Sequence, residues 1–293
     1  MAQICRNLNE LIINNCRDYP GLISLIDAQR NLKSVTIRPN LVKKGTCNGL
    51  GKALLRKSNT INSLRLYSIS IIPPSCLTSF VNLKKISLCC HKYYDGKEEI
   101  DQFQQYLAIL EFPTLEILHI HEVSCFKELS MLIEKTNGNI LAVNVYKNDA
   151  RDAGMLIKAI ANSCPKIREL SINIEPKDFM HVKPLLLNCK QLKCLNLNSS
   201  DFSAEENGNI GDELLDILTK FSPNSLTDVR ISAGWKYSIN SFEQFFESCR
   251  KRTLYFFVIN NCSRRYITKE HEEIVNKYVE EGVISCCIYP MRL

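Results

Sequence analysis

The sequence lacks the motifs that mark most enzymes and membrane proteins. Its 293 residues contain no P-loop, no Rossmann glycine fingerprint and no H-E-x-x-H zinc motif. No apolar run approaches the roughly 20 residues of a membrane-spanning helix. The N-terminus has no apolar signal core behind a charged start. These absences predict a non-enzymatic protein of the cytoplasm or nucleus, with no cofactor and no membrane segment.

Charge of one sign and flexible linkers are scarce as well. The 37 Lys and Arg residues exceed the 31 Asp and Glu residues by only six. The pI of about 8.6 is below the value typical of nucleic-acid-binding domains. Two basic clusters, 250–252 and 264–265, lie on opposite sides of a predicted strand, so nucleic acid is not an expected partner. Because no Pro/Gly/Ser-rich linker divides the chain, residues 1–293 are predicted to form a single domain.

What the sequence does contain is a repeat. Residues 164–172 and 189–197 both read C-x-x-L-x-x-L-x-L, where L is any aliphatic residue. The core template L-x-x-L-x-L starts at Leu8, Leu32, Ile61, Leu83, Leu115, Ile140, Ile167, Leu192, Leu226, Leu254 and, more weakly, Val283. These eleven starts run from 8 to 283 in ten steps, which gives a mean period of 27.5 residues. A period in the twenties is typical of leucine-rich repeats.

The repeat predicts an α/β solenoid. The alternating L-x-L residues place aliphatic side chains on one side of a short strand, and a return segment must then lead to the next parallel strand. Residues 98–110, 151–163, 212–221, 242–249 and 269–281 have helical patterns, and Pro184 should kink or shorten another helix. We therefore expect a right-handed horseshoe of about eleven repeats, with strands on the concave face and helices on the convex face.

The 14 cysteines follow the same register. Cys5, Cys164 and Cys189 lie three residues before a strand's first aliphatic residue, and Cys16 and Cys262 lie three residues after a last one. These are turn positions where a small, weakly polar side chain packs under a solenoid. Without a signal peptide or paired C-x-x-C motifs, reduced structural thiols are expected rather than disulfides or zinc ligands.

The register also predicts which side chains line the open strand face, where we expect a protein partner to bind. Tyr67, Cys89, His121 and Tyr146 should be neighbours in one row, beside Arg65, His119 and Asn144 in the next. Aromatic and Arg side chains are typical anchors of binding surfaces. The predicted partner-binding residues are Arg38, Arg65, Tyr67, His119, His121, Asn144, Tyr146, Asn173, Asn198 and Trp235. There are two alternatives to partner binding. The strand residues could be ordinary solvated side chains, and Trp235 could fold back as a cap over the repeat.

Cys89, His119 and His121 also suggest chemistry. Three such side chains could bind zinc, or Cys89 with His121 could act as a nucleophile and base. No carboxylate lies in register to orient either imidazole, and the predicted surface is open. We therefore predict neither a metal site nor a catalytic residue.

With the repeats identified, the chain resembles the repeat portion of F-box/leucine-rich-repeat proteins of the cysteine-containing type. The C-x-x-L-x-x-L-x-L copies carry this resemblance, and three strings at 58–64, 176–179 and 209–218 are similar to a divergent fungal group of such proteins. In that family an F-box binds the Skp1 adaptor of a cullin–RING ubiquitin ligase, and the repeats hold the substrate. Only seven residues precede Leu8, so the F-box is missing and the domain is interpreted as N-terminally truncated.

The resemblance implies that this chain captures a protein substrate on its concave face for an SCF-type ubiquitin ligase. Because the F-box is missing, recruitment of Skp1 by this chain alone is doubtful. The alternative is a free-standing leucine-rich-repeat scaffold or inhibitor with no connection to ubiquitin ligation.

Overall fold

A computed structural model describes residues 5–40, 45–90, 94–146, 150–199, 208–252, 254–260 and 266–288. The chain divides into two compact units, Met1–Ile140 and Leu141–Leu293. That residues 1–293 form a single domain stays a prediction.

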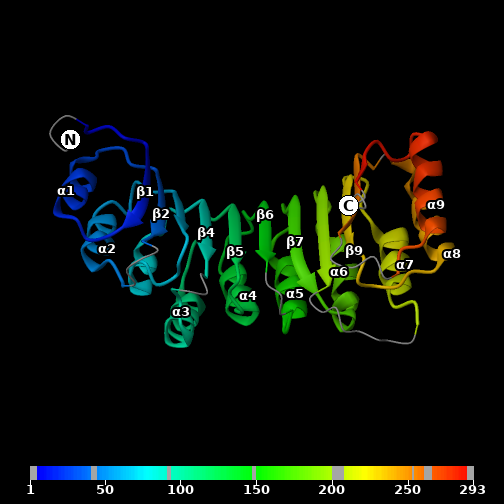
Figure 1. The fold of residues 1–293 in the computed structure, drawn as a ribbon, viewed down its shortest axis with the longest axis horizontal. Helices are drawn as coiled ribbons and strands as arrows, with labels where there is room; N and C mark the ends of the chain where they lie inside the picture. Colours follow the sequence, from blue (N-terminus) through cyan, green and yellow to red (C-terminus); the bar gives the residue numbers. More distant parts are fainter. Residues whose placement is uncertain are drawn as a thin grey trace. The chain divides into compact units, whose positions relative to one another are not determined.

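The first unit alternates parallel strands with helices. Its strands are β1 (Glu10–Cys16), β2 (Ser34–Pro39), β3 (Ser63–Leu66), β4 (Lys85–Cys89) and β5 (Ile117–His121), and each is hydrogen-bonded to the next in chain order. The return segments are α1 (Pro20–Ala28), α2 (Asn48–Leu55), the 3-10 helix η1 (Pro74–Ser79), α3 (Lys97–Ile109) and α4 (Phe126–Glu134). The helices of this unit follow one another along one side of the strands (Figure 1).

The second unit repeats this arrangement. Its strands are β6 (Ala142–Tyr146), β7 (Glu169–Ile174), β8 (Cys194–Ser199), β9 (Asp228–Ser232), β10 (Phe256–Asn260) and β11 (Cys287–Ile288), again parallel and in chain order. The return segments are α5 (Ala153–Ser163), η2 (Pro176–His181), α6 (Val182–Asn188), α7 (Gly211–Phe221), α8 (Ile239–Ser248), η3 (Cys249–Lys251) and α9 (Lys269–Glu280). Pro184 lies in α6, which has only seven residues and follows the 3-10 helix η2. A short helix was predicted here, because proline has no backbone N–H to donate within a helix.

The aliphatic template forms the core between strands and helices. Leu64 of β3 pairs with Val35 of β2 and with Ile86 of β4, and all three side chains are fully buried. Burying one such side chain stabilises a fold by roughly 1.5–3 kcal/mol, and a single repeat has no second layer against which to bury it. The parallel strands, the helical returns and this shared core form an α/β leucine-rich-repeat solenoid, as the repeat predicted.

The last copy of the repeat is out of the predicted register. The template places Cys286 opposite Phe257, whereas the structure pairs Phe257 with Cys287 and Leu254 with Ile284. Both Val283 and Ile284 are aliphatic, so the sequence fits the template in two frames. Cys286, the second template position of the other frame, is exposed, whereas Ile284 is 1% exposed, so the frame that starts at Ile284 faces the core.

Side chains from neighbouring repeats hold the helix ends; we call these contacts cross-repeat caps. Forward along the chain, the Asp18 carboxylate accepts hydrogen bonds from the N–H groups of Gly49 and Leu50 (2.9 and 2.8 Å) at the start of α2. Backward, side chains donate to the last carbonyls of the preceding helix: Lys57 to Asp27 (2.8 Å), Lys135 to Ala108 (3.1 Å) and Asn188 to Ala161 (3.1 Å). These contacts satisfy backbone groups that a helix cannot pair internally.

The cysteines of the described residues are free thiols. Cys16, Cys164 and Cys189 are buried as predicted, and the Cys189 thiol donates to the Cys164 carbonyl (3.6 Å). The prediction is wrong for Cys5, which is exposed. Cys5 precedes β1, and no described repeat packs against the outer side of that strand. Cys262 lies outside the described residues.

Candidate binding site on the strand face

The predicted rows of side chains exist on the strands of the first unit. In register, Thr36 lies opposite Arg65, Arg65 opposite Ser87, and Ser87 opposite His119. In the next row, Cys89 lies opposite His121. These residues alternate with the buried aliphatic positions, so their side chains point away from the core.

The two rows border a hollow of about 260 Å³, which we call the strand-face hollow. It is lined by Arg65, Leu66, Tyr67, Ser87, Cys89, His119 and His121. Four of the predicted partner-binding residues therefore come together here: Arg65, Tyr67, His119 and His121. The lining contains one guanidinium, one phenol and two imidazoles, and no carboxylate.

Arg38 fixes Tyr67 at the border of this hollow. Its guanidinium carbon lies 4.8 Å from the centroid of the Tyr67 ring, and Nη2 donates to the phenol oxygen at 3.4 Å. Nη1 donates to Asn14 Oδ1 at 3.0 Å, which orients the guanidinium from the other side. The hydrogen bond from Arg38, opposed by partial burial and aided by Arg65, lowers the pKa of Tyr67. The ring is thus held in one orientation before any partner arrives.

Cys89 is poorly suited to act as a nucleophile here. Burial raises the pKa of its thiol, and the negative charges of Asp95 and Glu122 raise it further. A thiol with a raised pKa stays protonated, whereas nucleophilic and metal-binding cysteines are thiolates. Among the described residues, no group of three or more His, Cys, Asp and Glu side chains is placed to hold a metal ion.

The second unit contains the remaining predicted strand residues. Tyr146 is 37% exposed at the end of β6. Asn173 and Asn198 lie opposite one another on β7 and β8. The prediction that Asn144 binds a partner is wrong, because Asn144 is only 6% exposed and its amide donates to Glu169 on the next strand (3.1 Å). Asn144 is therefore covered by its neighbour rather than offered to a partner.

The assignment of Trp235 as a partner-binding residue is also wrong. Its side chain is 2% exposed and packs edge-on against Phe179, with ring centroids 5.0 Å apart. The loop that contains it is held by Tyr237, which is also buried and donates to the Ser232 carbonyl at 2.8 Å. Trp235 is thus part of the core of the second unit, which is the folded-back alternative.

The basic cluster at 250–252 is occupied by structural contacts. Arg250 forms ion pairs with Glu247 and Glu281, and Arg252 donates to the carbonyls of Pro223 and Leu226. The other cluster, 264–265, lies outside the described residues. No helix in the described part of the chain is long and apolar enough to span a bilayer.

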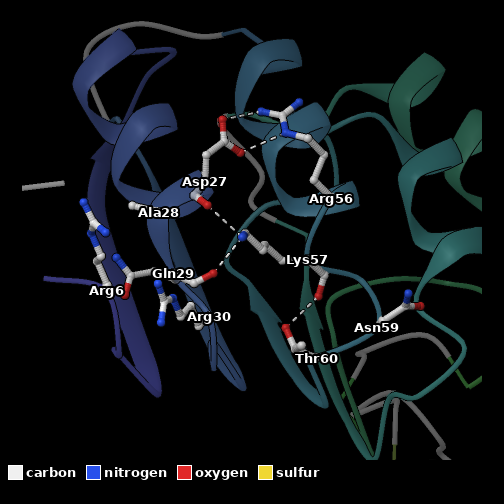
Figure 2. A pocket seen from close by; sticks show the side chains of 9 residues that line it. All are labelled: Arg6, Asp27, Ala28, Gln29, Arg30, Arg56, Lys57, Asn59 and Thr60. Atoms are coloured by element: carbon white, nitrogen blue, oxygen red, sulfur yellow. Dashed lines mark hydrogen bonds and ion pairs between the residues drawn. The ribbon is translucent and has the colours of Figure 1, made fainter. Parts of the chain in front are cut away.

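A second hollow of about 720 Å³, which we call the rim hollow, was missed by the sequence reasoning (Figure 2). It lies in the first unit, where helices end and strands begin, and its lining includes Arg6, Arg30 and Asn59. The sequence does contain a signal for this hollow. These three residues each lie two positions before the first aliphatic residue of a repeat copy, at Leu8, Leu32 and Ile61.

Comparison with known proteins gives a structural likeness and no sequence family. Neither the protein-family models nor the curated proteins contain a match to this sequence. A chain in the crystal structure of the Rad7–Elc1 complex from yeast is similar over 92% of this chain, with a TM-score of 0.57 and 16% identity. The match spans 64% of that chain's own length.

The leucine-rich-repeat-containing protein LegL7 from Legionella pneumophila matches over 95% of this chain and 90% of its own, with a TM-score of 0.46 and 11% identity. At these identities, likeness concerns the fold alone. The repeated strands and helices, together with the likeness to the yeast structure, establish the fold as an α/β leucine-rich-repeat solenoid.

Proposed function

We propose that this chain is a protein-binding module that captures its partner on the strand face of the first unit. The observation that carries the proposal is the strand-face hollow, where Arg65, Tyr67 and two histidines converge around about 260 Å³. Arginine and tyrosine are enriched among the residues that dominate binding energy. The side chain of Tyr67 is also fixed in advance by Arg38, which reduces the entropy lost on binding.

The charges of this hollow indicate the chemistry of the partner. Arg65 lines it and Arg38 stands beside it, while none of the lining residues is acidic. A partner segment with a carboxylate next to an apolar or aromatic group would meet a guanidinium and the Tyr67 ring together. Zinc or nucleophilic chemistry at Cys89 gains no support, because the pKa of its thiol is raised.

The biological context that we propose is substrate recognition for an SCF-type ubiquitin ligase in the cytoplasm or nucleus. The repeat copies with a leading cysteine at Cys164 and Cys189 support it through their resemblance to F-box/leucine-rich-repeat proteins. The Rad7–Elc1 complex gives an instance of a similar fold in a structure determined together with a second protein. A free-standing scaffold or inhibitor is the second candidate, because the same hollow would serve it equally.

Affinity capture from cell extract, followed by mass spectrometry, tests both parts of this proposal. The bait is the full chain, compared with an Arg65→Ala/Tyr67→Ala variant and a Tyr255→Ala control. Tyr255 is 62% exposed on the second unit, so its loss removes an exposed aromatic ring elsewhere. Circular dichroism would confirm that all three proteins are folded.

The two parts of the proposal have separate outcomes. Partners that disappear with Arg65→Ala/Tyr67→Ala but remain with Tyr255→Ala support the strand-face site, and identical protein lists refute it. Skp1 and a cullin retained with all three baits support the ligase context. Their absence, together with loss of one partner, favours the free-standing scaffold.

A further inference from the structure

We propose that the rim hollow of the first unit is a binding site for a phosphate group. The hollow is lined by Arg6, Asp27, Ala28, Gln29, Arg30, Arg56, Lys57, Asn59 and Thr60. Four of these residues are cations and one is an anion. Figure 2 shows Arg6 and Arg30 beside Gln29, apart from the pair that Asp27 forms with Arg56.

Two of the four cations, Lys57 and Arg56, already form hydrogen bonds within the fold. Lys57 donates to the carbonyls of Asp27 and Gln29 (2.8 and 2.6 Å), which offsets the negative end of α1. Arg56 forms two hydrogen bonds of 2.8 Å with the Asp27 carboxylate, through Nε and Nη2. The Asp27 charge is therefore matched by Arg56, and the carbonyls at the end of α1 are matched by Lys57.

The side chains of Arg6 and Arg30 form no comparable contacts among the described residues. Within the described part of the chain, neither guanidinium has a hydrogen bond, an ion pair or an aromatic contact. Both side chains are exposed, and both line the hollow. Two like charges at one site without a counter-charge raise the local positive potential, which favours an anion that lies between them.

Hydrogen bonds hold the backbone next to these two arginines. The Arg30 N–H donates to the Arg6 carbonyl (2.9 Å), which places the two residues side by side. The buried Gln29 amide donates to the Cys5 carbonyl (2.7 Å) and accepts from the Leu8 N–H (2.9 Å), fixing the segment on both sides of Arg6. A site whose backbone is already fixed loses little backbone entropy when a ligand binds.

A phosphate group matches these donors. A guanidinium presents parallel N–H groups that bind two phosphate oxygens at once, and two guanidiniums can share one doubly charged phosphate. The three arginines lie around one compact hollow rather than along a stripe, so the site suits one or two phosphate groups and not a nucleic-acid backbone. The phosphate could belong to a small molecule or to a phosphorylated side chain of a protein.

Isothermal titration of the full chain with pyrophosphate, and with a phosphoserine peptide and its serine counterpart, tests this site. The main variant is Arg6→Ala/Arg30→Ala. The control, Lys127→Ala/Lys158→Ala, removes two exposed cations that do not line the hollow. Arg6→Lys/Arg30→Lys keeps the charge but removes the paired donors. Thermal unfolding would verify that each variant is folded.

We expect the wild-type chain to bind pyrophosphate, and Arg6→Ala/Arg30→Ala to bind it at least about tenfold more weakly, a change of about 1.4 kcal/mol. The control should stay within about twofold, and the lysine variant should fall between. Tighter binding of the phosphoserine peptide than of pyrophosphate would identify a protein as the source, and the reverse order a small molecule. Either order supports the site.

Three results would overturn the proposal: no binding of either phosphorylated probe to the wild-type chain, equal loss in the control variant, or binding of the serine peptide as tight as that of both phosphorylated probes. Tyr67→Ala should leave pyrophosphate binding unchanged, because Tyr67 does not line the rim hollow. The phosphate site can therefore fail or succeed independently of the strand-face site.

Discussion

Asp95 offers the sharpest test of how the first unit supports its binding surface. This carboxylate is 5% exposed and accepts hydrogen bonds from the Ser68 hydroxyl (2.7 Å), the Ile69 N–H (3.3 Å), the Ser70 N–H (3.1 Å) and the Ser70 hydroxyl (2.6 Å). The segment that it holds begins one residue after Tyr67. We therefore expect Asp95→Ala to destabilise the unit and to loosen the border of the strand-face hollow.

The size of the effect follows from which donors lose their acceptor. The two serine hydroxyls are 3.1 Å apart and can bond to each other, so they lose little. The two backbone N–H groups have no such substitute, and a buried donor without a partner costs about 1–3 kcal/mol. Because Ser70 is only partly buried, we expect Asp95→Ala to lower the free energy of unfolding by about 2–4 kcal/mol. Asp95→Asn keeps one acceptor oxygen and should lose about half of that.

Urea unfolding followed by circular dichroism measures this free energy, and amide hydrogen exchange locates the change. The Ile69 and Ser70 amides should exchange faster in Asp95→Ala. Asp101→Ala, which removes an exposed carboxylate from α3, should change stability by no more than about 0.5 kcal/mol. A loss below about 1 kcal/mol in Asp95→Ala, or identical losses in Asp95→Ala and Asp95→Asn, would refute the reasoning.

Three further predictions concern single side chains. Trp235→Ala should lower the free energy of unfolding by about 3–5 kcal/mol, because it opens a cavity beside Phe179; a smaller loss in urea unfolding would contradict burial. Burial lowers the pKa of His271 below 6.5, so the unfolded chain binds its proton more readily, and stability present above pH 6.5 is lost as the pH falls below it. Urea unfolding at about pH 7.5 and 5.5 should show this slope, and His271→Phe should flatten it; equal slopes would exclude His271 as the cause. Once a partner is known, its binding should weaken at least about tenfold in Tyr67→Ala. It should weaken much less in Tyr67→Phe, because phenylalanine keeps the aromatic ring under Arg38. Similar losses of affinity in the two variants, measured by calorimetry, would assign the role to the Tyr67 hydroxyl.

The strands were predictable because one physical rule fixes them. An aliphatic residue at every second position must face the core, so the triplet at Ile61, Leu64 and Leu66 sets which residues of β3 are buried and which are exposed. The rule failed at the last copy, where two adjacent aliphatic residues fit the template in two frames. The pairings of Leu254 with Ile284 and of Phe257 with Cys287 distinguish them.

The side chains of the loops and rims were less predictable, because no period governs them. Nothing in the sequence around Trp235 indicates that Phe179, from a different repeat, closes over it. The burial of Asn144 depends on a cross-strand contact with Glu169, whose side-chain direction the repeat template leaves open. The rim hollow was visible as a repeated position, but its unmatched charge became apparent only once the partners of Lys57 and Arg56 were known.

The cross-repeat caps give the chain a polarity that its periodic sequence conceals. Asp18 accepts hydrogen bonds from the start of α2 in the following repeat, while Lys57 donates to the end of α1 in the preceding repeat. An internal repeat transplanted elsewhere would therefore lack both the acceptor from the preceding repeat and the donor from the following repeat, even with its aliphatic core intact. Grafting or deleting a repeat at the boundary between α1 and α2 would have to move Asp18 and Lys57 together with the helix ends that they bind, because the junction between two repeats behaves there as one unit.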